Sequence, residues 1–250
     1  MESIIFVHPA NDYTGSTRVL KDVIESEYSN FNKLVLTINE ENGILSSLDN
    51  VKIFNIWTPR LNGKRIPILS TTISYIHRVF LLLILCKGNR YFYVNTIVPS
   101  YAIIILSLLR KNIIWHIHEI LPNNNLKNLI RNKLVNRVVA HYVFVSKFVA
   151  NSYCLNPKSS YEIKYNKLNK DFVNNIVITP YKERDRKNIL MVCSISPFKG
   201  IPTYLEIARN MPQYCFNLVL AASQIEVENF KTNNLIPDNC VVFHQMNDLS

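Results

Sequence analysis

The chain has 250 residues, of which 48% are hydrophobic and only five are glycine. That length is enough for one large core, or for one core plus a smaller one, and so little glycine argues against a turn-rich all-β fold. Residues 1–187 hold 25 of the 28 Lys and Arg but 13 of the 18 Asp and Glu, a net charge of +12, whereas residues 188–250 have a net charge of −2. We therefore expect only the first part to meet an anionic partner, such as a membrane surface or a nucleic acid; ordinary solubility charge is the alternative.

Neither a signal peptide nor a membrane span is expected. The apolar run near the N-terminus is too short for a signal peptide, and no apolar stretch reaches the ~20 residues of a transmembrane helix. The five cysteines form no C-x-x-C pair, which is typical of reduced, buried side chains in a cytoplasmic protein. They are Cys86, Cys154, Cys193, Cys215 and Cys240.

Short apolar runs alternate with helical patterns along the first part of the chain. The sequence predicts strands at residues 3–8, 33–38, 51–56, 90–95, 113–118 and 140–145, and helices at residues 16–27, 68–86, 100–109 and 126–138. Ser146 is predicted to cap one more helix. Such alternation is typical of a parallel sheet with helices on both faces. Residues 156–171 break the rhythm and predict a surface loop or a poorly packed hairpin, before a strand at residues 175–179.

A second βα series follows a charged stretch. Residues 181–187 are predicted to link a first domain, residues 1–180, to a second domain, residues 188–250. In the second domain we expect strands at residues 188–194, 215–221 and 240–244 and helices at residues 200–210 and 224–233. A complete doubly wound domain has ~100–150 residues, so this second domain is predicted to be partial.

Polar residues at the carboxyl ends of parallel strands are candidate site residues, because ligands bind there in open α/β sheets. Gly15 and Ser16 open the first helix, where N–H groups and the helix dipole favour a phosphate, with Ser16 or Thr17 as the predicted cap. A simple turn glycine is the alternative. Asn95 and Thr96 end the fourth strand and suit hydrogen bonds to hydroxyl groups, or the start of a turn.

The fifth strand ends in His116, His118 and Glu119. Strand alternation places the two histidines on one face of the sheet. A His–x–His pair can bind a metal, but no third ligand follows at a suitable spacing, so we expect no metal. His118 and Glu119 are the predicted catalytic residues, with His118 positioning or donating to a substrate hydroxyl; a structural histidine is the alternative.

Two groups of basic residues are further candidates. Lys199 and Gly200 lie between a strand and a helix of the second domain, where an ammonium and a helix N-terminus together suit a diphosphate. The predicted helix at residues 126–138 carries four basic residues beside an apolar stripe, which is typical of contact with an anionic membrane. They are Lys127, Arg131, Lys133 and Arg137. Solvated charges, with the stripe packed in the core, are the alternative.

Taken in order, several segments resemble the landmarks of family 4 glycosyltransferases, especially bacterial O-antigen and capsule enzymes. They are FVHPANDYTGSTRVL (6–20), YVNTIV (93–98), IWHIHEI (114–120), VSKF (145–148), ILMVCSISPFKGI (189–201) and YLEIA (204–208). The resemblance implies a GT-B fold of two Rossmann-like domains and transfer of a sugar, with retention, from a nucleotide sugar. It further implies a lipid-linked polysaccharide acceptor, no metal or other cofactor, and a peripheral position on the inner face of the cytoplasmic membrane.

The resemblance also assigns roles to single residues. Gly15 matches the glycine near the donor phosphates, with Ser16 beside it. His118 matches the histidine that positions the transferring sugar. Lys199 matches the lysine that neutralises the leaving diphosphate. The remaining polar residues at the strand ends fall on the acceptor side: Asn95, Thr96 and His116.

Two departures from the family pattern leave alternatives open. Ser194–Ser196 stand where an arginine usually precedes the lysine, and the Glu-x7-Glu motif that holds the donor would lie beyond Ser250. A truncated, inactive relative that acts as a binding module is therefore one alternative. A sugar-nucleotide 2-epimerase-like enzyme is another. Nucleic-acid binding rests on charge alone, and we expect no nucleic-acid partner.

Overall fold

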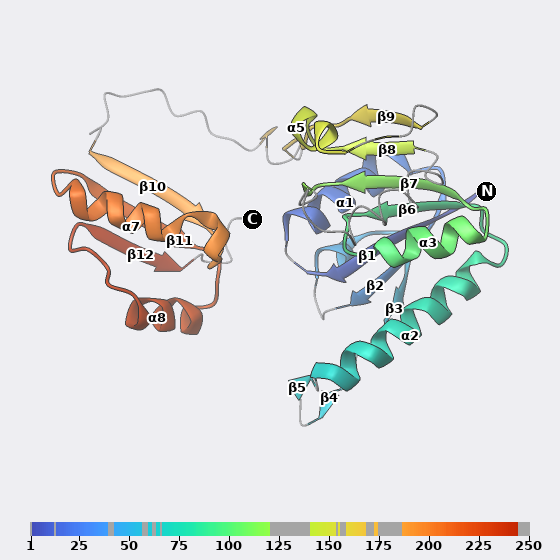
Figure 1. Cartoon of the computed structure of the whole chain (residues 1–250), viewed down its shortest axis with the longest axis horizontal. Coiled ribbons are helices and arrows are strands. Elements are labelled where there is room, and N and C mark those ends of the chain that lie inside the picture. The colour runs from blue at the N-terminus through green and yellow to red at the C-terminus, as the bar shows by residue number, and fades with distance from the viewer. Residues whose placement is uncertain are drawn as a thin grey trace. The chain divides into compact units, whose positions relative to one another are not determined.

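The computed structural model describes residues 2–12, 14–39, 43–56, 60–61, 64–65, 67–120, 141–153, 155, 159–168, 173–174 and 187–244. The chain divides into two compact units, Met1–Ile176 and Val177–Ser250. Each unit contains a parallel sheet of its own, as Figure 1 shows.

The first unit is built on a seven-stranded sheet in which every neighbouring pair of strands is parallel. In spatial order the strands are β3 (Val51–Asn55), β2 (Asn32–Asn39), β1 (Ser3–Asn11), β6 (Tyr91–Asn95), β7 (Asn112–Ile117), β8 (His141–Phe144) and β9 (Ser160–Ile163). The described helices are α1 (Gly15–Glu27), η1 (Ile44–Ser47), α2 (Pro67–Cys86), α3 (Ser100–Leu108) and α5 (Lys147–Asn151). The strand order reverses at β1 and β6, and open α/β sheets bind their ligands at such a point.

Strand side chains alternate between two hydrophobic clusters, one on each face of this sheet. Ile5 and Trp115 pack in the cluster that includes residues of α2, α3 and α5. Ile4 and Phe6 pack on the opposite face in the cluster that includes residues of α1. The strands read as continuous apolar runs because both of their faces are buried. The predicted parallel sheet with helices on both faces is confirmed.

One prediction for this sheet is wrong. Within the segment predicted to be a surface loop or a poorly packed hairpin, Ser160–Ile163 forms β9, the edge strand that pairs in parallel with β8. Three of its four side chains are exposed, so the segment lacks the apolar pattern by which a strand is recognised. A two-residue hairpin of β4 (Arg60–Leu61) and β5 (Lys64–Arg65) is also present and was not predicted.

Several sequence predictions fall outside the described residues and stay predictions. They are the helix at residues 126–138 with Lys127, Arg131, Lys133 and Arg137, the strand at residues 175–179, and residues 181–186 of the linker. Among the helices that the structure does describe, none is both long and apolar enough to cross a membrane.

The second unit has a three-stranded parallel sheet in the order β10 (Asn188–Cys193), β11 (Cys215–Leu220) and β12 (Cys240–His244). Helices α7 (Ile201–Asn210) and α8 (Gln224–Asn233) pack against it around Phe216 and Leu218. Ser223 and Glu226 form a capping box at the start of α8. Each predicted strand and helix of this unit is present to within about one residue at either end.

Candidate functional site

Polar side chains at the carboxyl ends of β1, β6 and β7 form one hydrogen-bonded network centred on Asn95, which is fully buried. Asn95 Nδ2 donates to the carbonyl oxygen of Ser16 at 3.1 Å and to His8 Nδ1, also at 3.1 Å. Asn95 Oδ1 accepts from His118 Nε2 at 2.9 Å. A carbonyl oxygen can only accept a hydrogen bond, so the side-chain atom of Asn95 that faces the Ser16 carbonyl must be the amide nitrogen Nδ2.

The orientation of the Asn95 amide in turn determines which ring nitrogen carries the proton in His118 and in His8. His118 must carry its proton on Nε2, which leaves Nδ1 with a free lone pair. His8 accepts through Nδ1 and therefore carries its proton on Nε2, 2.9 Å from Thr17 Oγ1. Thr17 donates onward to Asp12 Oδ1 at 2.6 Å. The network thus runs without a break from the Asp12 carboxylate to the imidazole of His118.

Burial keeps these histidines uncharged. It lowers the pKa of His8 to about 4 and the pKa of His118 to about 4. Burial raises the pKa of Asp12, but hydrogen bonds from Thr17 and Thr14 outweigh it, so the pKa is lowered overall. At neutral pH the site therefore presents a neutral His118 with an accepting Nδ1, which suits a hydrogen bond from a hydroxyl group.

His116 and His118 lie on the same face of β7 with ring centroids 4.3 Å apart, which confirms the prediction from strand alternation. His116 Nδ1 is 2.8 Å from the hydroxyl of Tyr93. Burial lowers the pKa of His116 to about 3. Within the described part of the chain, no group of three His, Cys, Asp or Glu is placed to hold a metal ion.

The turn that follows β6 is strained and held in place. Thr96 has a φ of 68°, a left-handed conformation that is unfavourable for a β-branched residue. Its N–H donates to the His116 carbonyl at 2.8 Å, and its carbonyl accepts from Trp115 Nε1 at 2.8 Å. Glu119 Oε2 accepts from the N–H of Ile97 at 3.2 Å and of His118 at 3.3 Å. Thr96 and Glu119 therefore shape the strand ends, while their predicted contact and catalytic roles stay predictions.

The start of α1 differs from its prediction. Thr14 is the N-cap residue and no side chain caps the helix, so the predicted cap by Ser16 or Thr17 is wrong. The Thr17 hydroxyl is instead held by Asp12, whose carboxylate also accepts from the Thr14 N–H at 3.0 Å. A Cβ placed on Gly15 would meet nothing within 4 Å, so the space beside this first turn is open. Phosphate binding at Gly15 and Ser16 stays a prediction.

Lys199 and Gly200 follow β10 in the second unit. Lys199 is exposed and ends a short 3-10 turn, η2 (Pro197–Lys199), in which Ser196 Oγ accepts from the Phe198 N–H at 3.4 Å. Gly200 has a φ of 75°, a conformation that favours glycine, and it precedes α7, which begins at Ile201. The predicted diphosphate contact at Lys199 and Gly200 stays a prediction.

Two members of the network, His8 and Asp12, are not singled out by the sequence, and Thr17 is singled out only as a helix cap. His8 lies on β1, the strand beside β6, and the carboxyl ends of adjacent parallel strands meet. A polar residue at the end of the first apolar run is therefore a sign of a site residue. To place His8 beside Asn95, however, one must know that the first and fourth predicted strands are neighbours, which the order of the strands along the chain does not reveal.

No protein-family model and no curated protein matches this sequence. Solved structures do match it. The crystal structure of Anabaena HepE (Alr3699) with UDP and glucose matches with a TM-score of 0.59 at 15% identity, over 97% of this chain and 70% of that one. A glycosyltransferase of Rickettsia africae gives 0.59 at 14% identity, over 99% and 69%. The spinosyn rhamnosyltransferase SpnG gives 0.55 at 10% identity, over 98% and 71%.

Structural similarity to proteins of such low sequence identity establishes the fold of this chain. Two parallel-sheet α/β units, matched along nearly the whole chain by glycosyltransferases, define a GT-B-type fold. The fold class predicted from the sequence is confirmed.

Proposed function

We propose that this chain is a glycosyltransferase of the family 4 type, which moves a sugar from a nucleotide sugar to a hydroxyl group of an acceptor. The observation that carries the proposal is the neutral His118 held by Asn95 at the strand ends of a GT-B-type fold. Solved proteins of this fold contain UDP with glucose in HepE and thymidine diphosphate in SpnG.

Each role follows from the chemistry of the side chain. His118 Nδ1 accepts a hydrogen bond from a hydroxyl of the transferring sugar, and Asn95 keeps the ring in the required tautomer. Lys199 neutralises the charge that develops on the departing diphosphate. The resemblance of the sequence to family 4 enzymes supports transfer with retention, without a metal, to a lipid-linked intermediate of a surface polysaccharide.

Binding of UDP and TDP by the whole chain, measured by calorimetry, tests the donor side of this proposal. Replacing Lys199 with alanine is expected to weaken binding about tenfold, because it removes a charge-assisted contact to the diphosphate. Lys231→Ala is the matched control, since Lys231 is on the same unit but is paired with Glu228 at 3.0 Å. Absence of binding for both nucleotides, or equal affinities for the two variants, would contradict the assignment.

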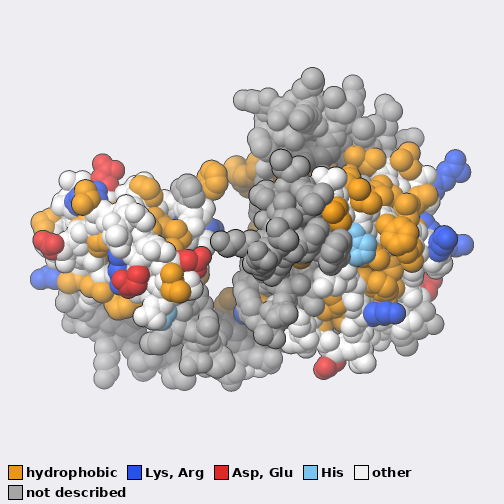
Figure 2. Space-filling view, turned by 90° about the horizontal axis from the view of Figure 1, so that it is seen from below, with side chains coloured by type: hydrophobic (Ala, Val, Ile, Leu, Met, Phe, Trp, Pro, Cys, Tyr) orange, Lys and Arg blue, Asp and Glu red, His pale blue; other side chains and the backbone are white. Residues whose placement is uncertain are grey.

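The membrane part of the proposal is supported by a surface of the first unit. Residues 51–118 contain nine Lys and Arg and no Asp or Glu. Within this stretch, exposed apolar side chains recur at helical spacing on α2 and on α3, which packs beside it: Ile76, Phe80, Leu83, Ile84, Ile104 and Leu108. Figure 2 shows hydrophobic side chains gathered on the first unit with Lys and Arg around them. An apolar face bordered by cations suits an anionic lipid surface.

Sedimentation with vesicles of phosphatidylglycerol and phosphatidylcholine tests this surface. The double variant Ile76→Glu, Phe80→Glu is expected to reduce vesicle binding by at least about tenfold, because two apolar contacts are lost and two negative charges are added. Both side chains are more than half exposed, at 63% and 57%, so the fold should tolerate the change. Ile225→Glu, on an exposed site of the second unit, is the control. Unchanged sedimentation of the double variant would refute a lipid contact here.

A further inference from the structure

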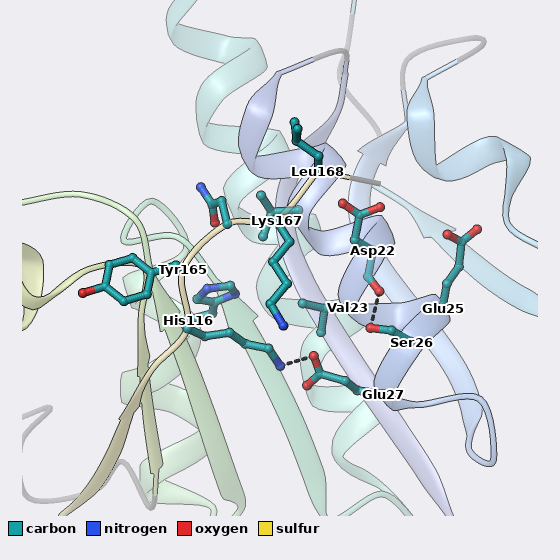
Figure 3. A pocket seen from close by; sticks show the side chains of 12 residues that line it. Asp22, Val23, Glu25, Ser26, Glu27, His116, Tyr165, Lys167 and Leu168 are labelled. Atoms are coloured by element: carbon teal, nitrogen blue, oxygen red, sulfur yellow. Dashed lines mark hydrogen bonds and ion pairs between the residues drawn. The ribbon is translucent and has the colours of Figure 1, made fainter. Parts of the chain in front are cut away.

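A separate cavity of about 490 Å³ lies on the α1 face of the first sheet. It is formed between α1 and residues 164–168, the segment that follows β9 (Figure 3). Val19 and Val23 of α1 and Leu168 of the segment give it apolar walls, and His116 of β7 lines it from the sheet. A cavity of this volume suits a small organic ligand.

His116 gives this cavity a polar atom that lacks a partner. The side chain is 1% exposed, and Nε2 has no hydrogen-bond partner. A phenol donates more readily than it accepts, so the Tyr93 hydroxyl donates to Nδ1 of the neutral ring, and Nε2 carries the proton. Buried N–H groups nearly always have an acceptor. The orphan N–H therefore points to a ligand oxygen in the cavity.

The charges around the cavity are mixed. Asp22, Glu25, Glu27, Lys164 and Lys167 line it. Lys164 is ion-paired with Glu27, and Glu25 lies 3.7 Å from Lys21 Nζ. Together with Lys21, which pairs with Glu25, these side chains have a net charge of zero, which gives a phosphate or a carboxylate no net attraction. Carboxylates and ammonium groups side by side can accept from and donate to the same neutral ligand. A ring with several hydroxyl groups and an apolar face matches this lining.

We propose that this cavity binds one neutral sugar unit of the acceptor, the unit next to the one that reacts. The assignment rests on the proposed function, which makes the acceptor a glycan. His116, which lines the cavity, lies directly beside His118, and their ring centroids are 4.3 Å apart. A glycan with its reacting hydroxyl beside His118 thus has a neighbouring sugar within reach of His116 Nε2.

Saturation-transfer NMR on the full 250-residue chain tests the proposal. The neutral probes are the methyl glycosides of glucose, galactose, rhamnose and N-acetylglucosamine, with glucuronate and glucosamine as charged counterparts. Neutral glycosides are expected to bind more tightly than charged ones. Asp22→Asn is expected to weaken their binding about tenfold, because a hydrogen bond to a charged group is lost. His116→Phe is expected to weaken it about fivefold, because a neutral hydrogen bond is lost. Asp49→Asn, the same change at an exposed position that does not line the cavity, should bind like the wild type.

The possible outcomes separate this proposal from the proposed function. Binding of UDP without any binding of neutral glycosides would overturn the proposal that the cavity binds a sugar, and would leave the transferase proposal intact. Binding of neutral glycosides that both cavity variants weaken, without binding of UDP, supports the cavity and overturns the transferase proposal. Glycoside binding that neither variant changes, or a preference for charged sugars, also overturns the cavity. If the His116→Phe variant does not fold, Asp22→Asn alone tests the proposal. It changes a partly exposed position of a helix, which the fold should tolerate.

Discussion

Replacing Asn95 with leucine is expected to lower the free energy of unfolding of the first unit by about 4 kcal/mol. Leucine has a similar volume but no polar atoms, so the Ser16 carbonyl, His8 Nδ1 and His118 Nε2 each lose a partner in a largely buried site. Each such orphan group costs ~1–3 kcal/mol. Urea denaturation followed by tryptophan fluorescence measures the change, because both tryptophans, at positions 57 and 115, belong to the first unit.

A matched control separates loss of the network from loss of a single hydrogen bond. Asn89 Nδ2 donates one bond, to the Leu85 carbonyl at 2.8 Å, outside the network. Asn89→Leu is therefore expected to cost only about 1 kcal/mol. Equal destabilisation by the two substitutions would show that Asn95 does not join three groups into one network.

The first unit is also expected to lose stability as the pH falls from 6.5 toward 4. The pKa values of His8 and His118 are about 4 and that of His116 is about 3, against 6.5 for an ordinary histidine. Between these limits the unfolded chain binds more protons than the folded one, so stability rises with pH by up to ~1.4 kcal/mol per pH unit for each histidine. We expect a loss of up to about 6 kcal/mol between pH 7.5 and pH 5, about 2 kcal/mol for each ring, because the rings stay uncharged in the folded chain and become protonated in the unfolded one.

Urea denaturation at a series of pH values measures this dependence. The contribution of Asp12, whose pKa is lowered, is lost only as the pH falls below its ordinary 3.8, and so falls outside this window. His116→Phe removes one of the three titrating rings and should make the dependence on pH visibly shallower. A stability that does not change between pH 7.5 and pH 5 would mean that the rings are charged, or hydrated, in the folded chain.

The sequence predicts most of the fold because most strands are buried on both faces. Strands such as β1 and β7 read as apolar runs, and their helices follow at regular intervals. Strand β9 escapes prediction because an edge strand with three exposed side chains looks like a loop. The sequence locates the end of β8 because Ser146 is recognisable as the cap of the next helix. In the structure, Ser146 Oγ accepts from the Val149 N–H at 3.2 Å.

The site is only partly predictable, for a physical reason. Asn95 and His118 were found because they end apolar strands, whereas their contact through Oδ1 and Nε2 depends on which strands are neighbours. The role of His8 depends on the same information. The cavity beside His116 depends on the path of residues 164–168 back across the sheet toward Glu27, which no local pattern in the sequence encodes.

Sugar transfer itself is the most direct test of the proposed function. The measurement is the release of nucleoside diphosphate from a panel of UDP- and TDP-sugars by the 250-residue chain, with a lipid-linked glycan extract as acceptor. We predict turnover of at least one donor and a fall of about a hundredfold for His118→Ala, with Lys231→Ala unchanged, because the proposal places His118, and not Lys231, against the transferring sugar. No release from any donor, or a His118→Ala variant as fast as the wild type, would contradict the assignment of this chain as a glycosyltransferase.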